Sequence, residues 1–201
     1  MKKTVYGVAL IVALGMSGCS VKTAPIVEYN LKSTLTLEPL EKTECMQKSL
    51  KVAQPFSSKS LESNNMNYRV GGLAEYTFSQ SQWTQSPNKT IAEEIVQTLR
   101  ASKIFKNVQL YKSRAKTDYI LETDIEEFIQ HFSADEKSSY TEVVLHATLI
   151  DYKTSSVVDS KKFRAKVDVN KLSAEGGVDA LSTAVSKILV QNVEWLHGVC
   201  R

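Results

Sequence analysis

Alternating apolar and polar residues between positions 119 and 169 constrain the fold of this chain more than any other sequence feature. Apolar or small residues occupy every second position from Tyr119 to Ile125, and the acidic residues Glu122 and Asp124 lie between them in the second half of this run. The alternation changes phase at Phe128, which predicts a β-bulge near Glu126 and Glu127. Residues 141–152 and 157–169 repeat the same period, which is typical of strands with one buried face. We therefore predict an antiparallel meander with one solvated face.

Two segments instead show the apolar spacing of helices. In the first, Ser86-Pro87 provides a favourable start, and an apolar stripe follows to an expected end near Ser102. Thr90 and Glu93 offer an alternative capping box. The second helix is expected from about residue 174 or 178 to Leu196, with Gly198 as its C-cap. The two stripes consist of Ile91, Ile95 and Leu99, and of Val178, Leu181, Val185, Ile188 and Trp195.

Shorter runs predict further strands at residues 26–31, 46–56 and 104–112, and two strands within 66–78 joined at Gly71-Gly72. Gly176-Gly177 is also interpreted as a turn. Strands, helix, strands and helix in this order predict an α+β fold. We expect a curved, mainly antiparallel sheet with two helices packed on one face, forming a single domain over residues 26–201.

The first nineteen residues have the pattern of an export signal. Met1-Lys2-Lys3 is basic, and the apolar run from Val5 to Met16 is shorter than the roughly 20 residues that span a bilayer. The run ends in Ser17-Gly18-Cys19, which looks like a bacterial lipobox. Residues 1–18 are then a signal peptide, and Cys19 receives the lipid through its nucleophilic thiol.

The alternative is an ordinary secretory signal in which Cys19 has no role. Residues 19–25 are interpreted as a lipidated tether that joins the membrane to the domain. Ser20 follows the modified position. In enteric-type sorting an Asp at that position retains lipoproteins in the inner membrane, so Ser20 favours the outer membrane.

Cys45 and Cys200 remain in the mature chain, 155 residues apart. In an oxidising compartment such a pair tends to form a disulfide, and we predict one between these two residues. The alternative is two free thiols buried as small apolar side chains. Neither cysteine belongs to a CxxC pattern, so the sequence gives no support for a zinc or redox site.

Charge and motifs give little support for catalysis, cofactors or nucleic acid. Without Lys2 and Lys3 the chain has 23 basic against 22 acidic residues, so no strong field favours nucleic acid. No phosphate-binding loop, GxSxG elbow or zinc-binding spacing occurs in the sequence. We expect no catalytic residue, metal ligand or cofactor-binding residue. His131, His146 and His197 are scattered and interpreted as structural or solvated.

Two other groups of residues leave alternatives open. Asp124, Glu126 and Glu127 could form a glycosidase-like carboxylate pair, although a solvated strand face is the commoner explanation. Aromatic side chains could line a hydrophobic groove, although core packing is the usual role of aromatics in apolar stripes. These aromatics are Tyr29, Trp83, Phe128 and Trp195.

An ordered set of short motifs behind the lipobox resembles the ABC-type transport auxiliary lipoproteins, which are partners of MCE-type intermembrane lipid transporters. The resemblance covers roughly residues 29–196. Its carriers are Tyr29-Asn30-Leu31, Tyr76, Trp83, Pro87, Asp118-Tyr119-Ile120-Leu121, Ile125-Glu126-Glu127-Phe128, Ala147-Thr148-Leu149-Ile150-Asp151, Phe163 and Glu194-Trp195-Leu196. Cys45 and Cys200 are not part of this pattern.

The resemblance implies a non-catalytic periplasmic subunit tethered to the outer membrane. Its implied partners are an MCE-type lipid-binding protein, an ABC permease, an ATPase and the membrane itself, with phospholipid as a further candidate. A scaffold lipoprotein for envelope assembly or secretion is the alternative. A periplasmic hydrolase is a third hypothesis, but the sequence supplies no recognisable nucleophile and base.

Overall fold

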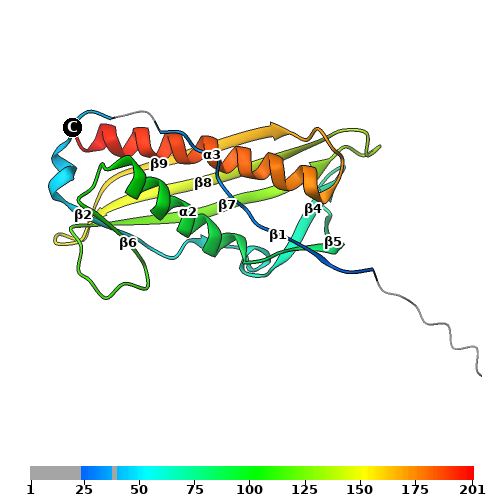
Figure 1. The fold of residues 1–201 in the computed structure, drawn as a ribbon, viewed down its shortest axis with the longest axis horizontal. Coiled ribbons are helices and arrows are strands. Elements are labelled where there is room, and N and C mark those ends of the chain that lie inside the picture. Colours follow the sequence, from blue (N-terminus) through cyan, green and yellow to red (C-terminus); the bar gives the residue numbers. More distant parts are fainter. Residues whose placement is uncertain (1–23, 38–39) are drawn as a thin grey trace, which may run out of the picture.

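A computed structural model of the protein describes residues 24–37 and 40–201. Within these residues one mixed nine-stranded sheet carries two α-helices on the same face (Figure 1). This arrangement confirms the predicted single α+β domain. The predicted signal peptide, Cys19 and Ser20 lie outside the described residues. None of the described helices is long and apolar enough to cross a membrane.

Three long strands form the predicted meander. β7 (Tyr119–Phe132) pairs antiparallel with β8 (Ser139–Asp151), which pairs antiparallel with β9 (Ser156–Asp168). The register of β7 on β8 shifts between Ile125 and Glu127, which confirms the predicted bulge. Among the described residues β9 has no partner beyond β8 and therefore forms an edge of the sheet.

Short strands cover the other side of β7. Three of them pair parallel with β7, one after another along its length: β2 (Ser49–Val52), β3 (Phe56–Ser57) and β4 (Asn65–Val70). Three more pair outside these, namely β6 (Asn107–Leu110) with β2, β5 (Glu75–Trp83) with β4, and β1 (Val27–Tyr29) with β5. The sheet is therefore antiparallel in its long strands and mixed as a whole. Two short 3-10 helices, η2 (Glu44–Gln47) and η3 (Lys59–Glu62), connect the short strands.

Helix α2 (Pro87–Ser102) begins and ends where the sequence predicts. Pro87 occupies its first turn, and Lys103 ends it in the left-handed backbone region with φ of 56°. The Ser86 hydroxyl hydrogen-bonds to the Asn88 side chain and makes no cap bond to the backbone. Ile91, Ile95 and Leu99 are buried against the sheet, as the spacing of four residues requires.

Helix α3 (Ala174–Val199) begins at the earlier of the two predicted starts and extends three residues beyond the predicted end at Leu196. Ser173 caps it by accepting a hydrogen bond from the amide of Gly176, so Gly176-Gly177 belongs to the first helical turn and the predicted turn there is wrong. A Cβ on Gly176 would lie 2.1 Å from the Lys171 carbonyl oxygen, which explains why a glycine stands there. The helix also continues through Gly198, so the predicted C-cap at that residue is wrong.

The core fills the space between the helices and the meander. Helix α2 packs on β6 and β2, and helix α3 packs on β9, β8 and β7, with the buried residues of these elements in one core. The least exposed large side chains include Leu50, Ile91, Ile95, Leu99, Ile104, Leu121, Leu149, Ile188, Leu189 and Leu196. The long axis of the molecule follows α3 and the meander, so the domain has two distinct ends (Figure 1).

Candidate functional site

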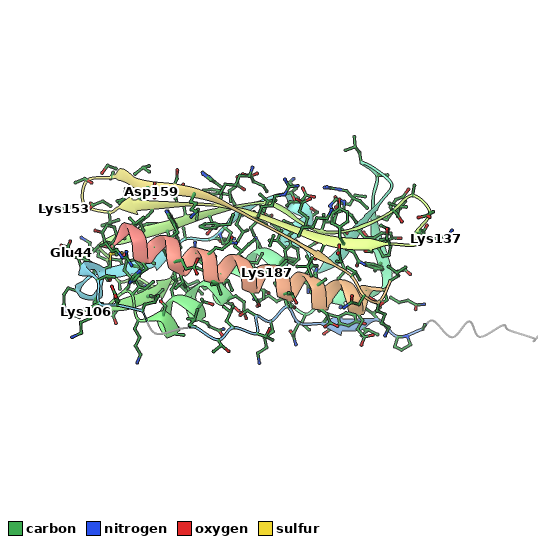
Figure 2. All side chains as sticks on the ribbon, turned by 90° about the horizontal axis from the view of Figure 1, so that it is seen from above. Glu44, Lys106, Lys137, Lys153, Asp159 and Lys187 are labelled. Carbon is green, nitrogen blue, oxygen red and sulfur yellow. A yellow bond between two sulfur atoms is a disulfide. The ribbon has the colours of Figure 1, made fainter. Side chains whose placement is uncertain are left out.

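The two ends of the domain contain different elements. The disulfide end contains η2, the last turn of α3 and the β8–β9 turn at residues 152–155. The hairpin end contains the β4–β5 turn at residues 71–74, the β7–β8 turn at residues 133–138 and the loop at residues 169–173. Figure 2 shows Lys137 at the hairpin end, and Glu44, Lys106 and Lys153 at the disulfide end.

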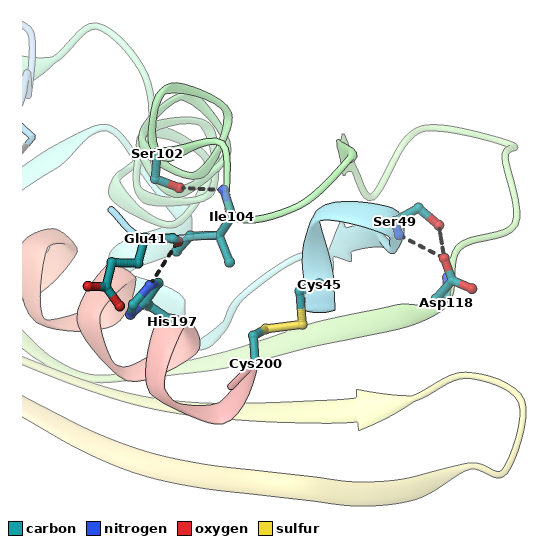
Figure 3. Close-up of a disulfide and its surroundings, with 8 residues drawn as sticks. All are labelled: Glu41, Cys45, Ser49, Ser102, Ile104, Asp118, His197 and Cys200. Atoms are coloured by element: carbon teal, nitrogen blue, oxygen red, sulfur yellow. Dashed lines mark hydrogen bonds between the residues drawn. A yellow bond between two sulfur atoms is a disulfide. The ribbon is translucent and has the colours of Figure 1, made fainter. Parts of the chain in front are cut away.

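Cys45 and Cys200 form a disulfide in the structure, with their Cα atoms 5.4 Å apart (Figure 3). Both residues are buried. The Glu44 amide donates to the Cys200 carbonyl at 3.1 Å, which adds a backbone bond between the same two segments. The bond therefore joins the end of α3 to the segment that leads into β2.

A polar contact next to the disulfide fixes the start of β7. The amide and hydroxyl of Ser49 both lie 2.7 Å from one carboxylate oxygen of Asp118 (Figure 3). The Ser49 hydroxyl bond, followed by the bond from its amide, lowers the pKa of the Asp118 carboxyl below its usual value. These contacts explain part of the Asp118-Tyr119 motif as structural support for the β2–β7 pairing.

A pocket of about 190 Å³ lies towards the hairpin end, between β4, β5, β7 and the start of α3. Its apolar wall includes Met66, Trp83, Phe128 and Leu181, and its polar wall includes Arg69, Asn67, Glu127 and Gln130. Small-molecule sites typically measure about 300–1,000 Å³. This pocket is smaller than that range.

The polar wall of the pocket is internally paired. Arg69 forms ion pairs with Glu127 and, at 3.4 Å, with Glu75. The Gln130 amide donates to the Ser139 hydroxyl at 3.0 Å, and Gln130 is almost fully buried. A Cβ on Gly177 would lie 2.0 Å from the Gln130 side-chain oxygen, so the glycine makes room for this glutamine. The pocket therefore has a fixed polar lining.

Of the three carboxylates considered for catalysis, Glu126 and Glu127 line the same pocket and Asp124 does not, and each of the first two is paired with a cation. Glu126 pairs with Lys162 on the solvated face of the meander, and Glu127 pairs with Arg69. Asp124 is exposed and lies opposite His146 in the β7–β8 register. Cross-strand ion pairs of this kind are expected on a solvated sheet face. The geometry supports the solvated-face interpretation over a glycosidase-like pair.

The three histidines occupy three separate places. His131 stacks on Tyr140 with ring centroids 4.7 Å apart, whereas His197 lies 3.2 Å from the Glu41 carbonyl oxygen. Burial, followed by the charge of Arg69, lowers the pKa of His131. Within residues 24–37 and 40–201, no three His, Cys, Asp or Glu side chains are grouped to hold a metal ion.

The four candidate groove aromatics fall into two places, because Tyr29 is paired in register with Trp83 and Trp195 lies apart. Trp83 and Phe128 pack together at 5.8 Å between ring centroids and line the pocket. Trp195 packs on Phe163 and donates to the Asp159 carboxylate at 2.7 Å. Tyr29 lies beside β5 and the start of α3. Trp83, Phe128 and Trp195 are therefore buried, the first two together and the third in another part of the core, so the four aromatics do not form one groove.

Sequence reasoning missed the cluster of aromatic side chains that supports the hairpin. Tyr68 contacts Tyr76, Phe78 and Phe132, at ring-centroid distances of 5.6, 4.4 and 5.5 Å. Tyr68 lies on β4, Tyr76 and Phe78 lie on β5, and Phe132 lies at the end of β7. Because these aromatics come from three strands, no local sequence pattern indicated the cluster. The buried Gln130 was missed for the same reason.

A protein-family model described as "ABC-type transport auxiliary lipoprotein component" matches residues 29–191. No curated protein matches the chain in sequence.

Among solved structures, a crystal structure of a protein from Xanthomonas campestris is similar with a TM-score of 0.76 and 18% identity. It covers 86% of this chain and 96% of that protein. A crystal structure of an uncharacterized protein has a TM-score of 0.63 and 12% identity, over 87% of this chain and 98% of that one. At these identities the likeness concerns the fold alone.

Proposed function

This chain belongs to the ABC-type transport auxiliary lipoprotein component family, and from that premise we propose that it serves an intermembrane phospholipid transporter of the MCE type. In this proposal it is a periplasmic accessory subunit anchored to the outer membrane by acyl chains on Cys19. Its folded domain docks the periplasmic lipid-carrying MCE protein, which works with an ABC permease and an ATPase.

The observation that carries the proposal is the combination of two features in one chain. A lipobox-like sequence ends at Cys19, and the family match begins only ten residues later, at Tyr29. A thioether-linked diacylglycerol and a further acyl chain would hold such a domain stably at a membrane, because each buried methylene adds about 0.8 kcal/mol. The Cys45–Cys200 disulfide supports export, because disulfides persist in oxidising compartments.

The proposed role is docking and not chemistry. The carboxylates of Glu126 and Glu127 are each engaged by a cation, and His131 is stacked and partly buried. The pocket between β4, β5, β7 and α3 is small and internally paired, so it offers little room for a phospholipid. These features favour a protein that positions a lipid carrier over one that carries or hydrolyses lipid itself.

The anchor is tested by replacing Cys19→Ala in the full-length chain. We expect the variant to leave the membrane fraction and to reproduce the outer-membrane barrier defect of a transporter deletion. Ser20→Asp is the matched variant, because it keeps the lipidated cysteine and changes only the residue that directs sorting. It should stay in membranes but move to the inner-membrane fraction. A soluble Cys19→Ala protein that restores the barrier fully would contradict the tethering role.

The partner is tested by crosslinking in cells, membrane purification and mass spectrometry of co-purifying proteins and lipids. The proposal requires an MCE protein, with its permease and ATPase, among the crosslinked partners. Recovery of envelope-assembly or secretion components without any MCE protein would favour the alternative scaffold role. The same purification asks whether phospholipid accompanies the chain.

A further inference from the structure

The turn between β4 and β5 presents a leucine to solvent. Leu73 is 96% exposed, more than any other large apolar side chain in the described residues. Gly71 precedes it with φ of +60°, and its amide donates to the Phe132 carbonyl at 3.0 Å. A Cβ on Gly71 would lie 3.0 Å from the Cβ of Ala134. The base of the turn is therefore fixed against the β7–β8 turn, and the leucine projects beyond it.

The hairpin that carries Leu73 is well packed. Tyr68 on β4 lies among Tyr76, Phe78 and Phe132, which come from β5 and β7. Aromatic contacts at these distances stabilise a structure beyond the area that they bury. Arg69 and Glu75 add an ion pair across the two strands. The exposure of Leu73 is thus a property of an ordered hairpin.

More of the large exposed apolar side chains lie towards this end than near the β8–β9 turn, where Tyr152, Val157 and Val158 are exposed. Isolated exposed apolar residues are common and need no explanation, so their grouping is the informative feature. Among nine large exposed ones in the described residues, five belong to the β4–β5 hairpin, the start of β1 or the loop before α3. These five are Ile26, Val27, Leu73, Tyr76 and Leu172. Figure 1 shows β1 and the β4–β5 hairpin at one end and the carboxyl terminus at the other.

The proposed lipid anchor must lie near the same end. Cys19 precedes Ala24, the first described residue, by five peptide units. Each unit spans at most about 3.6 Å, so the anchor can be no more than about 18 Å from Ala24. β1 runs parallel to β5 with Val27 opposite Ser81, so its start points towards the beginning of β5 and hence the hairpin turn. The disulfide end lies more than the length of the tether away, at the far end of α3.

We propose that the hairpin end contacts the phospholipid surface of the anchoring membrane, with Leu73 inserted at the boundary between headgroups and acyl chains. This inference rests on the lipidation of Cys19 in the proposed function. The exposed cations of this end, Lys137 and Lys171, are paired with Asp135 and Glu175. The surface therefore suits a zwitterionic lipid headgroup region more than a highly charged one. The long axis then stands away from the membrane, and the disulfide end faces the periplasm.

The test places a tryptophan at each end of the lipidated full-length protein. Leu73→Trp reports on the hairpin end, and Val157→Trp, at a side chain that is 62% exposed near the β8–β9 turn, is the matched control. Each protein is reconstituted in vesicles of phosphatidylethanolamine and phosphatidylglycerol, with or without bromine on the acyl chains. Bromine quenches tryptophan emission at close range, and the natural Trp83 and Trp195 are buried and subtracted as background.

We expect brominated acyl chains to reduce the added emission of Leu73→Trp by about twofold, because an interfacial side chain reaches about 5–10 Å into the acyl boundary. Val157→Trp should be unaffected. Equal quenching at both sites, or at neither while the protein still floats with the vesicles, overturns the inference and leaves the anchor intact. Failure to float overturns the anchor and this inference together. If Leu73→Trp emission is already shielded in detergent by a second copy, the lipid contact is likewise overturned.

Discussion

Different interactions hold the short strands in place at the two ends of the domain. At the disulfide end, a covalent bond joins η2 to α3, and hydrogen bonds from the Ser49 amide and hydroxyl to the Asp118 carboxylate connect the start of β2 with the start of β7. At the hairpin end, β4 and β5 are held by aromatic packing and an ion pair, and the turn projects an uncovered leucine. The comparison indicates that one end is built for stability and the other for contact.

The largest effect should follow the loss of the disulfide. We expect a Cys45→Ser, Cys200→Ser double variant to lose about 3–5 kcal/mol of unfolding free energy, because the bond closes a loop of 155 residues. Urea denaturation of the parent and the variant measures this difference. The parent treated with reductant serves as a control and should match the double variant. A loss well below 1 kcal/mol would show that hydrogen bonds alone hold the disulfide end together.

The glycines of α3 compare the two ends within one helix. Gly176→Ala should cost about 2 kcal/mol, since the added Cβ meets a backbone carbonyl oxygen 2.1 Å away. Gly198→Ala is the matched control near the other end, where nothing lies within 4 Å of the added carbon. It should be neutral or stabilise the protein by about 0.5–1 kcal/mol, because alanine is the better helix former. Thermal unfolding measures both, and equal effects would contradict the close approach at the first turn of α3.

A smaller, pH-dependent effect is expected at the hairpin end from His131. Burial lowers the pKa of this histidine in the folded state, and the charges of Arg69 and Lys166 act in the same direction against Glu127 and Glu142. The unfolded chain therefore binds the proton first as pH falls below about 6.5. Stability should decrease from that pH down through the folded-state pKa, and should be fully retained above it.

The variant His131→Gln tests the source of this decrease. Melting temperatures of the parent and the variant between about pH 7.5 and 5.5 should diverge, with the variant losing less stability on acidification. If the melting temperatures of the parent and the variant fall in parallel with pH, protonation of His131 is not the source of the decrease in stability.

The smallest effect concerns Leu73 itself. The Leu73 side chain is almost fully exposed. Leu73→Ser should therefore change the unfolding free energy of the protein by no more than about 0.5 kcal/mol. Chemical denaturation provides the measurement. Phe78→Leu is the comparison variant, since it removes an aromatic ring from the cluster around Tyr68 and should cost more. A large loss for Leu73→Ser would mean that the leucine supports the fold.

Periodicity predicted the parts of the fold in which neighbours along the chain share an environment. The stripe of Ile91, Ile95 and Leu99 defined α2, and the phase change before Phe128 located the bulge in β7. The family resemblance was also confirmed over residues 29–191. These features are local, so one sequence contains enough information to locate them.

Features that depend on distant partners were not predictable in the same way. β3 has only two residues, Phe56 and Ser57, so no period could indicate that it pairs parallel with β7. Gly176-Gly177 was interpreted as a turn. The true reason for the two glycines is the close approach of Lys171 and Gln130, which leaves no room for a Cβ and exists only in the folded chain. The exposure of Leu73 likewise depends on where the hairpin ends relative to β7.

The separation of Cys45 and Cys200 also has a consequence for the timing of biogenesis. In an exported chain Cys45 reaches the oxidising side of the membrane before Cys200. Cys200 follows only after all the strands from β2 to β9 and both helices have crossed the membrane. The native bond can therefore close only when translocation of the whole domain is complete. Until then the Cys45 thiol remains available to oxidoreductases and to cysteines of other chains. The arrival of the end of α3 is therefore the step that allows the native disulfide to form.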